Sequence, residues 1–172
     1  AQTMGLYWNK TVFTNAGLAP AAPPKTWTEL TSAANTISEK LGGDGVYGLI
    51  FGDKYTWVWW MNAAVPAMSA GAYTFDFKTG RYNFNQDGVK QALQVVMDIN
   101  KGGGIFPGPH TMTDDDARQQ FSIGSAGMII GGSWNPGVFN NQFNSTEDWD
   151  TTELAFPDSG IKGRVEQGIG DR

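Results

Sequence analysis

Hydrophobic residues recur with helical spacing in two long stretches of the chain. The first stretch follows Thr26, which stands three residues before Glu29 at the spacing of a capping box. The second follows Asn85, which we expect to cap it. The apolar face of the first is Trp27, Leu30, Ala34, Ile37 and Leu41, and that of the second is Val89, Ala92, Leu93, Val96 and Ile99. The pattern predicts two amphipathic helices, which end at Gly42 and Gly102.

Short apolar runs predict strands around these helices. Residues 45–51 and 127–130 are mostly apolar and indicate buried strands, and residues 1–8 indicate a strand at the start of the chain. Residues 73–77 and 81–84 flank a Lys-Thr-Gly turn and predict a hairpin. Strands that alternate with helices favour the α/β class, with helices packed on a largely parallel sheet.

Composition excludes several classes of function. The chain has 172 residues, the size of one domain, and no cysteine, which excludes a disulfide framework, a thiol nucleophile and a cysteine-ligated metal. A single histidine, His110, argues against a multi-histidine metal site or a Ser-His-Asp triad. A net charge of −5 without a basic run argues against a nucleic-acid partner. The seven Trp and 23 Gly residues are left to be explained.

Two of the predicted buried strands lead directly into aromatic loops. Ligands of open α/β sheets collect outside the carboxyl ends of the strands, and two parallel strands would bring both loops to the same edge. The candidate ligand contacts are Asp53, Tyr55, Trp57 and Trp59 in the loop after residues 45–51, and Trp134 and Asn135 in the loop after residues 127–130.

These residue types suit a sugar. Aromatic rings stack on the apolar C–H faces of sugar rings, and carboxylate and amide groups match the hydroxyl rims. Gly131 and Gly132 add no side-chain bulk, so we expect a ligand to approach the backbone there. Most Trp residues simply pack in the core, and we assign Trp8, Trp27 and Trp149 to packing. At least one Trp of residues 57–60, within a predicted helix at 57–68, also belongs to the core.

Other chemistries have weaker support. The acidic run 114–116 lacks the ligand spacing of a calcium loop, and acidic residues in a first helical turn complement the helix dipole. Glycoside hydrolysis needs two carboxylates, whereas Asp53 is the only acid in either aromatic loop. His110 lies between loop residues, and we expect it to be exposed and without a role. We therefore expect no enzymatic activity, no cofactor and no metal.

Several segments resemble one known family. Residues 5–13 (GLYWNKTVF), 16–18 (AGL) and 23–30 (PPKTWTEL) resemble a recurrent stretch of bacterial extracellular solute-binding proteins, the sugar-binding subunits of ABC importers related to maltose-binding protein. Residues 121–128 (FSIGSAGM) and 131–134 (GGSW) resemble later segments of the same family in the same order. The resemblance runs through nearly the whole chain.

The resemblance implies a type II periplasmic binding protein fold, in which two α/β lobes close over a ligand. Residues 1–172 would form a single α/β lobe, the middle segment of a larger chain whose first lobe and C-terminal helices are missing. The binding aromatics of the family map onto Tyr55 or Trp57 and onto Trp134. The implied partners are a carbohydrate ligand and the transmembrane subunits of an ABC permease, and the implied location is extracytoplasmic.

Two alternatives stay open from the sequence. One is a fragment of a carbohydrate-active enzyme with an aromatic sugar subsite, and the other is a protein of the same fold that binds a solute other than a sugar. The sequence does not name the sugar. Closure requires that the closed form bind the solute more tightly than the open form, so an isolated lobe is expected to bind sugar weakly or not at all.

Overall fold

The computed structural model describes residues 2–54, 70–72, 74–159 and 166–167. The predicted helix at 57–68 lies outside these residues. The helices are α1 (Lys10–Asn15), α2 (Trp27–Leu41), α5 (Asp87–Lys101), α6 (Asp114–Ser122) and α7 (Asn135–Gly137). The strands are β1 (Gln2–Asn9), β2 (Tyr47–Ile50), β3 (Phe75–Asp76), β4 (Arg81–Tyr82), β5 (Ala126–Gly132), β6 (Trp149–Thr152) and β7 (Glu166–Gln167). Among the described residues, no helix is long and apolar enough to cross a membrane.

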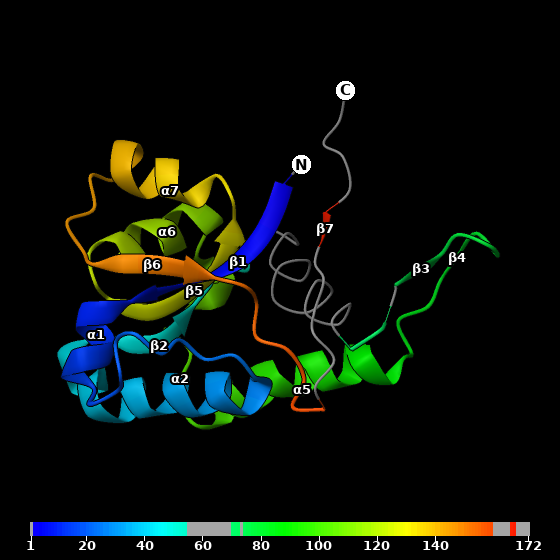
Figure 1. Cartoon of the computed structure of the whole chain (residues 1–172), viewed down its shortest axis with the longest axis horizontal. Helices are drawn as coiled ribbons and strands as arrows, with labels where there is room; N and C mark the ends of the chain where they lie inside the picture. The colour runs from blue at the N-terminus through cyan, green and yellow to red at the C-terminus, as the bar shows by residue number, and fades with distance from the viewer. Residues whose placement is uncertain (1, 55–69, 73, 160–165, 168–172) are drawn as a thin grey trace.

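The main sheet is mixed, with the strand order β2-β5-β1-β6 and with β7 also beside β1 (Figure 1). Strands β2 and β5 pair in parallel, whereas β1 runs antiparallel to β5, β6 and β7. The α/β class is confirmed, but the expectation of a largely parallel sheet is wrong. Strands buried on both faces are continuous apolar runs in either orientation, so the pattern holds no information about direction. The strand that separates β1 from β2 is β5, which comes about 120 residues after β1.

Helices cover both faces of this sheet (Figure 1). One face packs against α1, α2 and α5, with a core that includes Leu6, Leu49 and Met128. The other face packs against α6 and the segment after α7, with Tyr7, Ile129 and Phe139 in its core. The β3–β4 hairpin, predicted from its flanking apolar runs, extends away from this body beyond the start of α5 (Figure 1).

Local signals predicted the helix starts with one exception. Thr26 and Glu29 form the expected capping box at the start of α2. Helix α5 begins one residue later than expected, because Gln86 rather than Asn85 occupies the N-cap position. Leu93, which we expected on the buried face of α5, is 39% exposed. Its neighbour Ala92 is buried, so the stripe of α5 that meets the core is narrower than its apolar face.

Three tryptophans pack as expected. Trp8 and Trp27 are buried, and their indole Nε1 atoms donate to the carbonyl oxygens of Pro20 (2.9 Å) and Ala155 (3.1 Å). Trp149 packs edge-on against Phe139 at a ring-centroid distance of 5.2 Å. A buried indole normally finds an acceptor for its N–H group, and both buried tryptophans satisfy this requirement.

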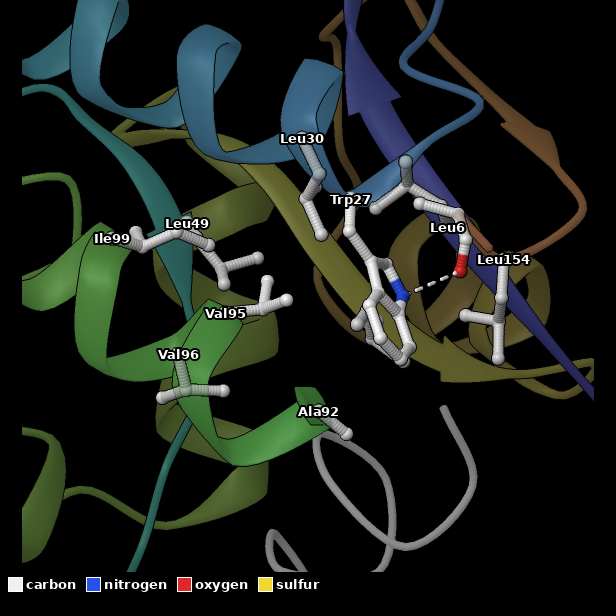
Figure 2. Close-up of a pocket in the computed structure, with 11 residues that line it drawn as sticks. Leu6, Trp27, Leu30, Leu49, Ala92, Val95, Val96, Ile99 and Leu154 are labelled. Atoms are coloured by element: carbon white, nitrogen blue, oxygen red, sulfur yellow. Dashed lines mark hydrogen bonds between the residues drawn. The ribbon is translucent and has the colours of Figure 1, made fainter. Parts of the chain in front are cut away.

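A small apolar cavity lies between α2, α5 and the sheet (Figure 2). The ring of Trp27 points into it, together with aliphatic side chains such as Leu30, Val96 and Ile99. Its volume of about 20 Å³ is far below the several hundred Å³ of typical ligand pockets. The cavity is therefore a gap in core packing and not a solute site.

Candidate functional site

The parallel pairing of β2 with β5 brings the two aromatic loops to the same edge of the sheet. Tyr47 lies opposite Ala126 and Ile50 lies opposite Ile129, so both strands end there. Because β1 is antiparallel to β5, its first residues lie at this edge too, with Met4 opposite Gly132. The prediction that the loops share an edge is confirmed for their described parts. Tyr55, Trp57 and Trp59 lie outside the described residues.

The loop after β2 is fixed by its backbone to the segment before α6. The N–H of Asp53 donates to the carbonyl of Pro109 (2.7 Å), and the N–H of Lys54 donates to that of Met112 (3.0 Å). A Cβ atom at Gly52 would lie less than 3.0 Å from backbone atoms of Thr113, closer than real Cβ atoms approach. This close packing holds Asp53 at the edge of the sheet.

Asp53 pairs there with the single histidine of the chain. Its Oδ2 atom lies 3.0 Å from Nδ1 of His110, and the aspartate side chain remains 35% exposed. His110 is exposed, as expected from the sequence, and this contact joins it to a candidate site residue. The two residues are 57 positions apart, and no motif connects them.

The loop after β5 folds back on its own glycines. The six-membered ring of Trp134 lies over Gly132, and the amide of Asn135 lies against Gly131, so a Cβ atom at either glycine would clash with these side chains. The expectation that the two glycines let a ligand reach the backbone is therefore wrong. They make room for Trp134 and Asn135, and Trp134 itself stays partly exposed.

Two hydrogen bonds attach this loop to β1. The N–H of Ser133 donates to the carbonyl of Thr3 (2.9 Å), and the hydroxyl of Tyr7 donates to the carbonyl of Gly132 (2.8 Å). Burial raises the pKa of Tyr7, against a smaller opposite effect of its hydrogen bond with Thr151, so the phenol keeps its proton and remains a donor.

Asn135 follows β5 as the sequence suggested, but its side chain is buried. It is 1% exposed, and its Oδ1 atom accepts a hydrogen bond from Nε of Arg118 (3.1 Å). A side chain so buried has no surface to offer, so the prediction of Asn135 as a direct ligand contact conflicts with the structure. Its amide instead connects the loop after β5 to α6. Sequence reasoning missed Arg118, because 17 residues separate the pair and no motif marks it.

The acidic residues 114–116 at the start of α6 make hydrogen bonds within this helix and its cap. Thr113 and Asp116 form a capping box, in which the N–H of Thr113 donates to Oδ2 of Asp116 (2.7 Å). The hydroxyl of Thr113 also donates to this carboxylate and is the main reason why the pKa of Asp116 is lowered. The described residues contain no group of three or more histidine, cysteine or acidic side chains able to hold a metal ion.

Hydroxyl groups gather beside the loop after β5. An open depression is lined by Ser133 of this loop, Pro136 of α7, Glu153 after β6, and residues of β1 and β6, among them Thr3, Thr151 and Thr152. The described part of this edge thus combines one partly exposed indole with hydroxyl groups and with the carboxylates of Asp53 and Glu153. Such a combination can stack on an apolar face and exchange hydrogen bonds with hydroxyl groups of a solute.

Replacing Gly132 by alanine is expected to displace the Trp134 ring. The new methyl group would occupy the space that the ring now fills, and such overpacking costs about 1–3 kcal/mol. The emission of Trp134, obtained as the difference between each protein and its Trp134→Phe counterpart, should shift to the red. Gly137→Ala is the matched control, because its Cβ atom would lie 4.0 Å from the nearest side chain. Unchanged emission in Gly132→Ala would contradict this packing.

Three comparisons with known proteins agree on the fold. The sequence model described as "Bacterial extracellular solute-binding protein" matches residues 1–166. A sn-glycerol-3-phosphate-binding periplasmic protein of Agrobacterium fabrum is 31% identical over 130 residues, which are 72% of this chain and 28% of that protein. The chain therefore spans less than a third of the length of this relative.

Solved structures give the same picture. The cyclic alpha-maltosyl-1,6-maltose binding protein of Arthrobacter globiformis superposes with a TM-score of 0.73 at 25% identity, over 94% of this chain and 39% of that one. An ABC transporter solute-binding protein of Agrobacterium vitis, with bound D-mannitol, gives a TM-score of 0.75 at 24% identity, over 94% and 38%. The fold of the described residues is that of type II periplasmic binding proteins.

Proposed function

Because the chain belongs to the bacterial extracellular solute-binding proteins, we propose that it forms one lobe of a protein that binds a neutral mono- or oligosaccharide for an ABC importer. The observation that carries this proposal is the joint position of Trp134 and Asp53 at the ends of two parallel strands. A stacking ring and a carboxylate acceptor at the same edge are what a sugar ring with its hydroxyl rim requires. Tyr55, Trp57 and Trp59 follow Asp53 in the same loop and are proposed to complete the aromatic surface.

A sugar phosphate is the second candidate, since the relative from Agrobacterium fabrum is named for sn-glycerol 3-phosphate. Charge favours the neutral solute. Asp53 and Glu153 place two carboxylates at the edge. The positive charge of Lys54 acts on the carboxylate of Asp116, and the buried cation behind the loop, Arg118, is already bonded to Asp114 and Asp115. A phosphate recruited to this edge would have to compete with these carboxylates for the guanidinium.

The mechanism we propose is closure of two lobes over the solute. This lobe would supply one wall of the cleft, and the other lobe would supply the opposite wall and remove the remaining water. Closure follows because the solute contacts both walls only in the closed form, and the closed form would then dock on the permease. In this account the protein acts outside the cytoplasm, as a carrier and not as an enzyme. In this account the complete protein has both lobes.

Calorimetric titration of the complete protein separates the two candidates. Maltose, D-mannitol and sn-glycerol 3-phosphate, added separately, cover an oligosaccharide, a polyol and a phosphate ester. We expect saturable heat with at least one neutral solute and none with the phosphate ester. Binding of sn-glycerol 3-phosphate alone would replace the proposal with the second candidate. Micromolar binding of a sugar by residues 1–172 on their own would contradict the need for a second lobe.

A further inference from the structure

A buried arginine lies directly behind the loop that carries Trp134. Arg118 of α6 is 9% exposed, and its guanidinium donates hydrogen bonds to acidic side chains of α6 and to the side chain of Asn135. Guanidinium groups are rarely buried without partners, because the cost of removing the charge from water must be offset by hydrogen bonds. The hydrogen bonds of Arg118 therefore show which parts of the structure the buried guanidinium holds in place.

Two carboxylates hold the guanidinium from one side. Nη1 donates to Asp115 (2.6 Å) and Nη2 donates to Asp114, three and four residues earlier on the same helix. Burial raises the pKa of Asp114, whereas the positive charge of Arg118 acts in the opposite direction. Because the guanidinium is planar, fixing its two Nη atoms also fixes the direction of the Nε–H group. That group points at Oδ1 of Asn135.

Asn135 transmits this orientation to the loop. Within the described part of the chain, its Nδ2 atom is buried and has no hydrogen-bond partner, so the bond to Arg118 is what orients the amide. The amide lies against Gly131, and the neighbouring Trp134 lies over Gly132. The side chains of these two consecutive residues thus fill the space beside two consecutive glycines. A movement of Asn135 would therefore also move the backbone from which the Trp134 indole projects.

We propose that Arg118 is a positioning residue of the solute site, which acts through Asn135 to set the orientation of the Trp134 ring. The orientation itself can be measured without a solute. Its consequence for affinity rests on the proposed function, in which this ring contacts a sugar. The orientation of the Trp134 ring and the affinity for the sugar are therefore tested separately, and either can fail without the other.

Three variants separate positioning from general stability. Arg118→Lys keeps a positive charge near Asp114 and Asp115 but removes the Nε–H donor. Asn135→Ala keeps Arg118 and removes the acceptor, and it provides the same test should Arg118→Lys fail to fold. Asp115→Asn is the matched control for charge, because the amide oxygen of asparagine can still accept from Nη1 and keep the guanidinium direction while one carboxylate is lost.

Fluorine NMR of the complete protein labelled with fluorotryptophan reports on the environment of the Trp134 ring. The Trp134 resonance is assigned by its loss in Trp134→Phe. We expect it to shift in Arg118→Lys and in Asn135→Ala, to shift no further in the double variant, and to stay in place in Asp115→Asn. The resonance of Trp27, which lies in the core, should not move. A folded Arg118→Lys or Asn135→Ala protein with an unshifted Trp134 resonance would overturn the proposal, as would an equal shift in Asp115→Asn.

Affinity for maltose gives the second readout. We expect Arg118→Lys and Asn135→Ala to weaken binding about tenfold and Asp115→Asn to leave it unchanged, a tenfold loss being equivalent to about 1.4 kcal/mol. If the Trp134 resonance shifts while the affinity is unchanged, Arg118 positions the ring but the ring does not contact maltose. That outcome would count against the proposed function and leave the positioning role intact. An unshifted resonance with weaker binding would count against positioning alone.

Discussion

Replacing Trp134 by alanine in the complete protein is expected to weaken sugar binding by about 30- to 100-fold. A large apolar side chain that becomes fully buried contributes about 2–3 kcal/mol, and each 1.4 kcal/mol corresponds to a factor of ten in affinity. The indole is partly exposed in this chain and lies at the edge from which both loops leave, so a solute can complete its burial. Titration calorimetry with the tightest-binding sugar of the series measures the loss.

Trp149→Phe is the control for the loss of an indole. Trp149 packs against Phe139 and Tyr7 in the second core, so its replacement should leave the affinity unchanged. Trp134→Phe keeps an aromatic ring and should fall between the alanine variant and the unaltered protein. Equal affinities of the Trp134→Ala protein and the unaltered protein would remove this ring from the site.

Alanine at Gly48 is expected to lower the free energy of unfolding by about 3 kcal/mol or more. A Cβ atom at this position in β2 would overlap the carbonyl and Cα atoms of Ala34, so the sheet and α2 would have to separate. Overpacking usually costs about 1–3 kcal/mol when side chains can adjust. Here the obstacle is helix backbone, which cannot change rotamer, and the cost should reach the upper end or exceed it. Urea unfolding followed by circular dichroism measures the change.

Gly43→Ala is the matched substitution for this test. No atom lies within 4 Å of the position of its Cβ, and its backbone angle φ is not positive, so alanine should be tolerated within about 0.5 kcal/mol. A Gly48→Ala protein as stable as the Gly43→Ala protein would show that α2 does not pack directly on β2.

Local patterns predicted much of the fold. The start of α2 follows from the Thr26–Glu29 capping box, and β2 and β5 follow from short apolar runs, because each signal lies within a few residues. The direction of β1 could not be predicted, since it depends on pairing with a strand more than a hundred residues away. An apolar run indicates that a strand is buried, whereas the strands that pair with it are determined by the tertiary fold.

For the candidate site, too, local features were predicted and contacts between distant segments were not. The aromatic loops were found from strand ends, and the parallel pairing of β2 with β5 confirms that both loops leave the same edge. The contacts Asp53–His110 and Arg118–Asn135 join distant segments, so spacing along the sequence gave no signal for them. The two glycines before Trp134 were noticed but misinterpreted, because composition cannot distinguish room for a ligand from room for a neighbouring side chain. Tyr55, Trp57 and Trp59 stay predictions.

The most direct test of the central claim is the fluorine resonance of Trp134 during titration of the labelled complete protein with the sugar that calorimetry identifies. If the ring lies against the bound sugar, the resonance should shift and saturate together with the heat of binding, while the Trp149 resonance stays in place. Saturable binding with an unmoved Trp134 resonance would contradict the claim and place the sugar elsewhere.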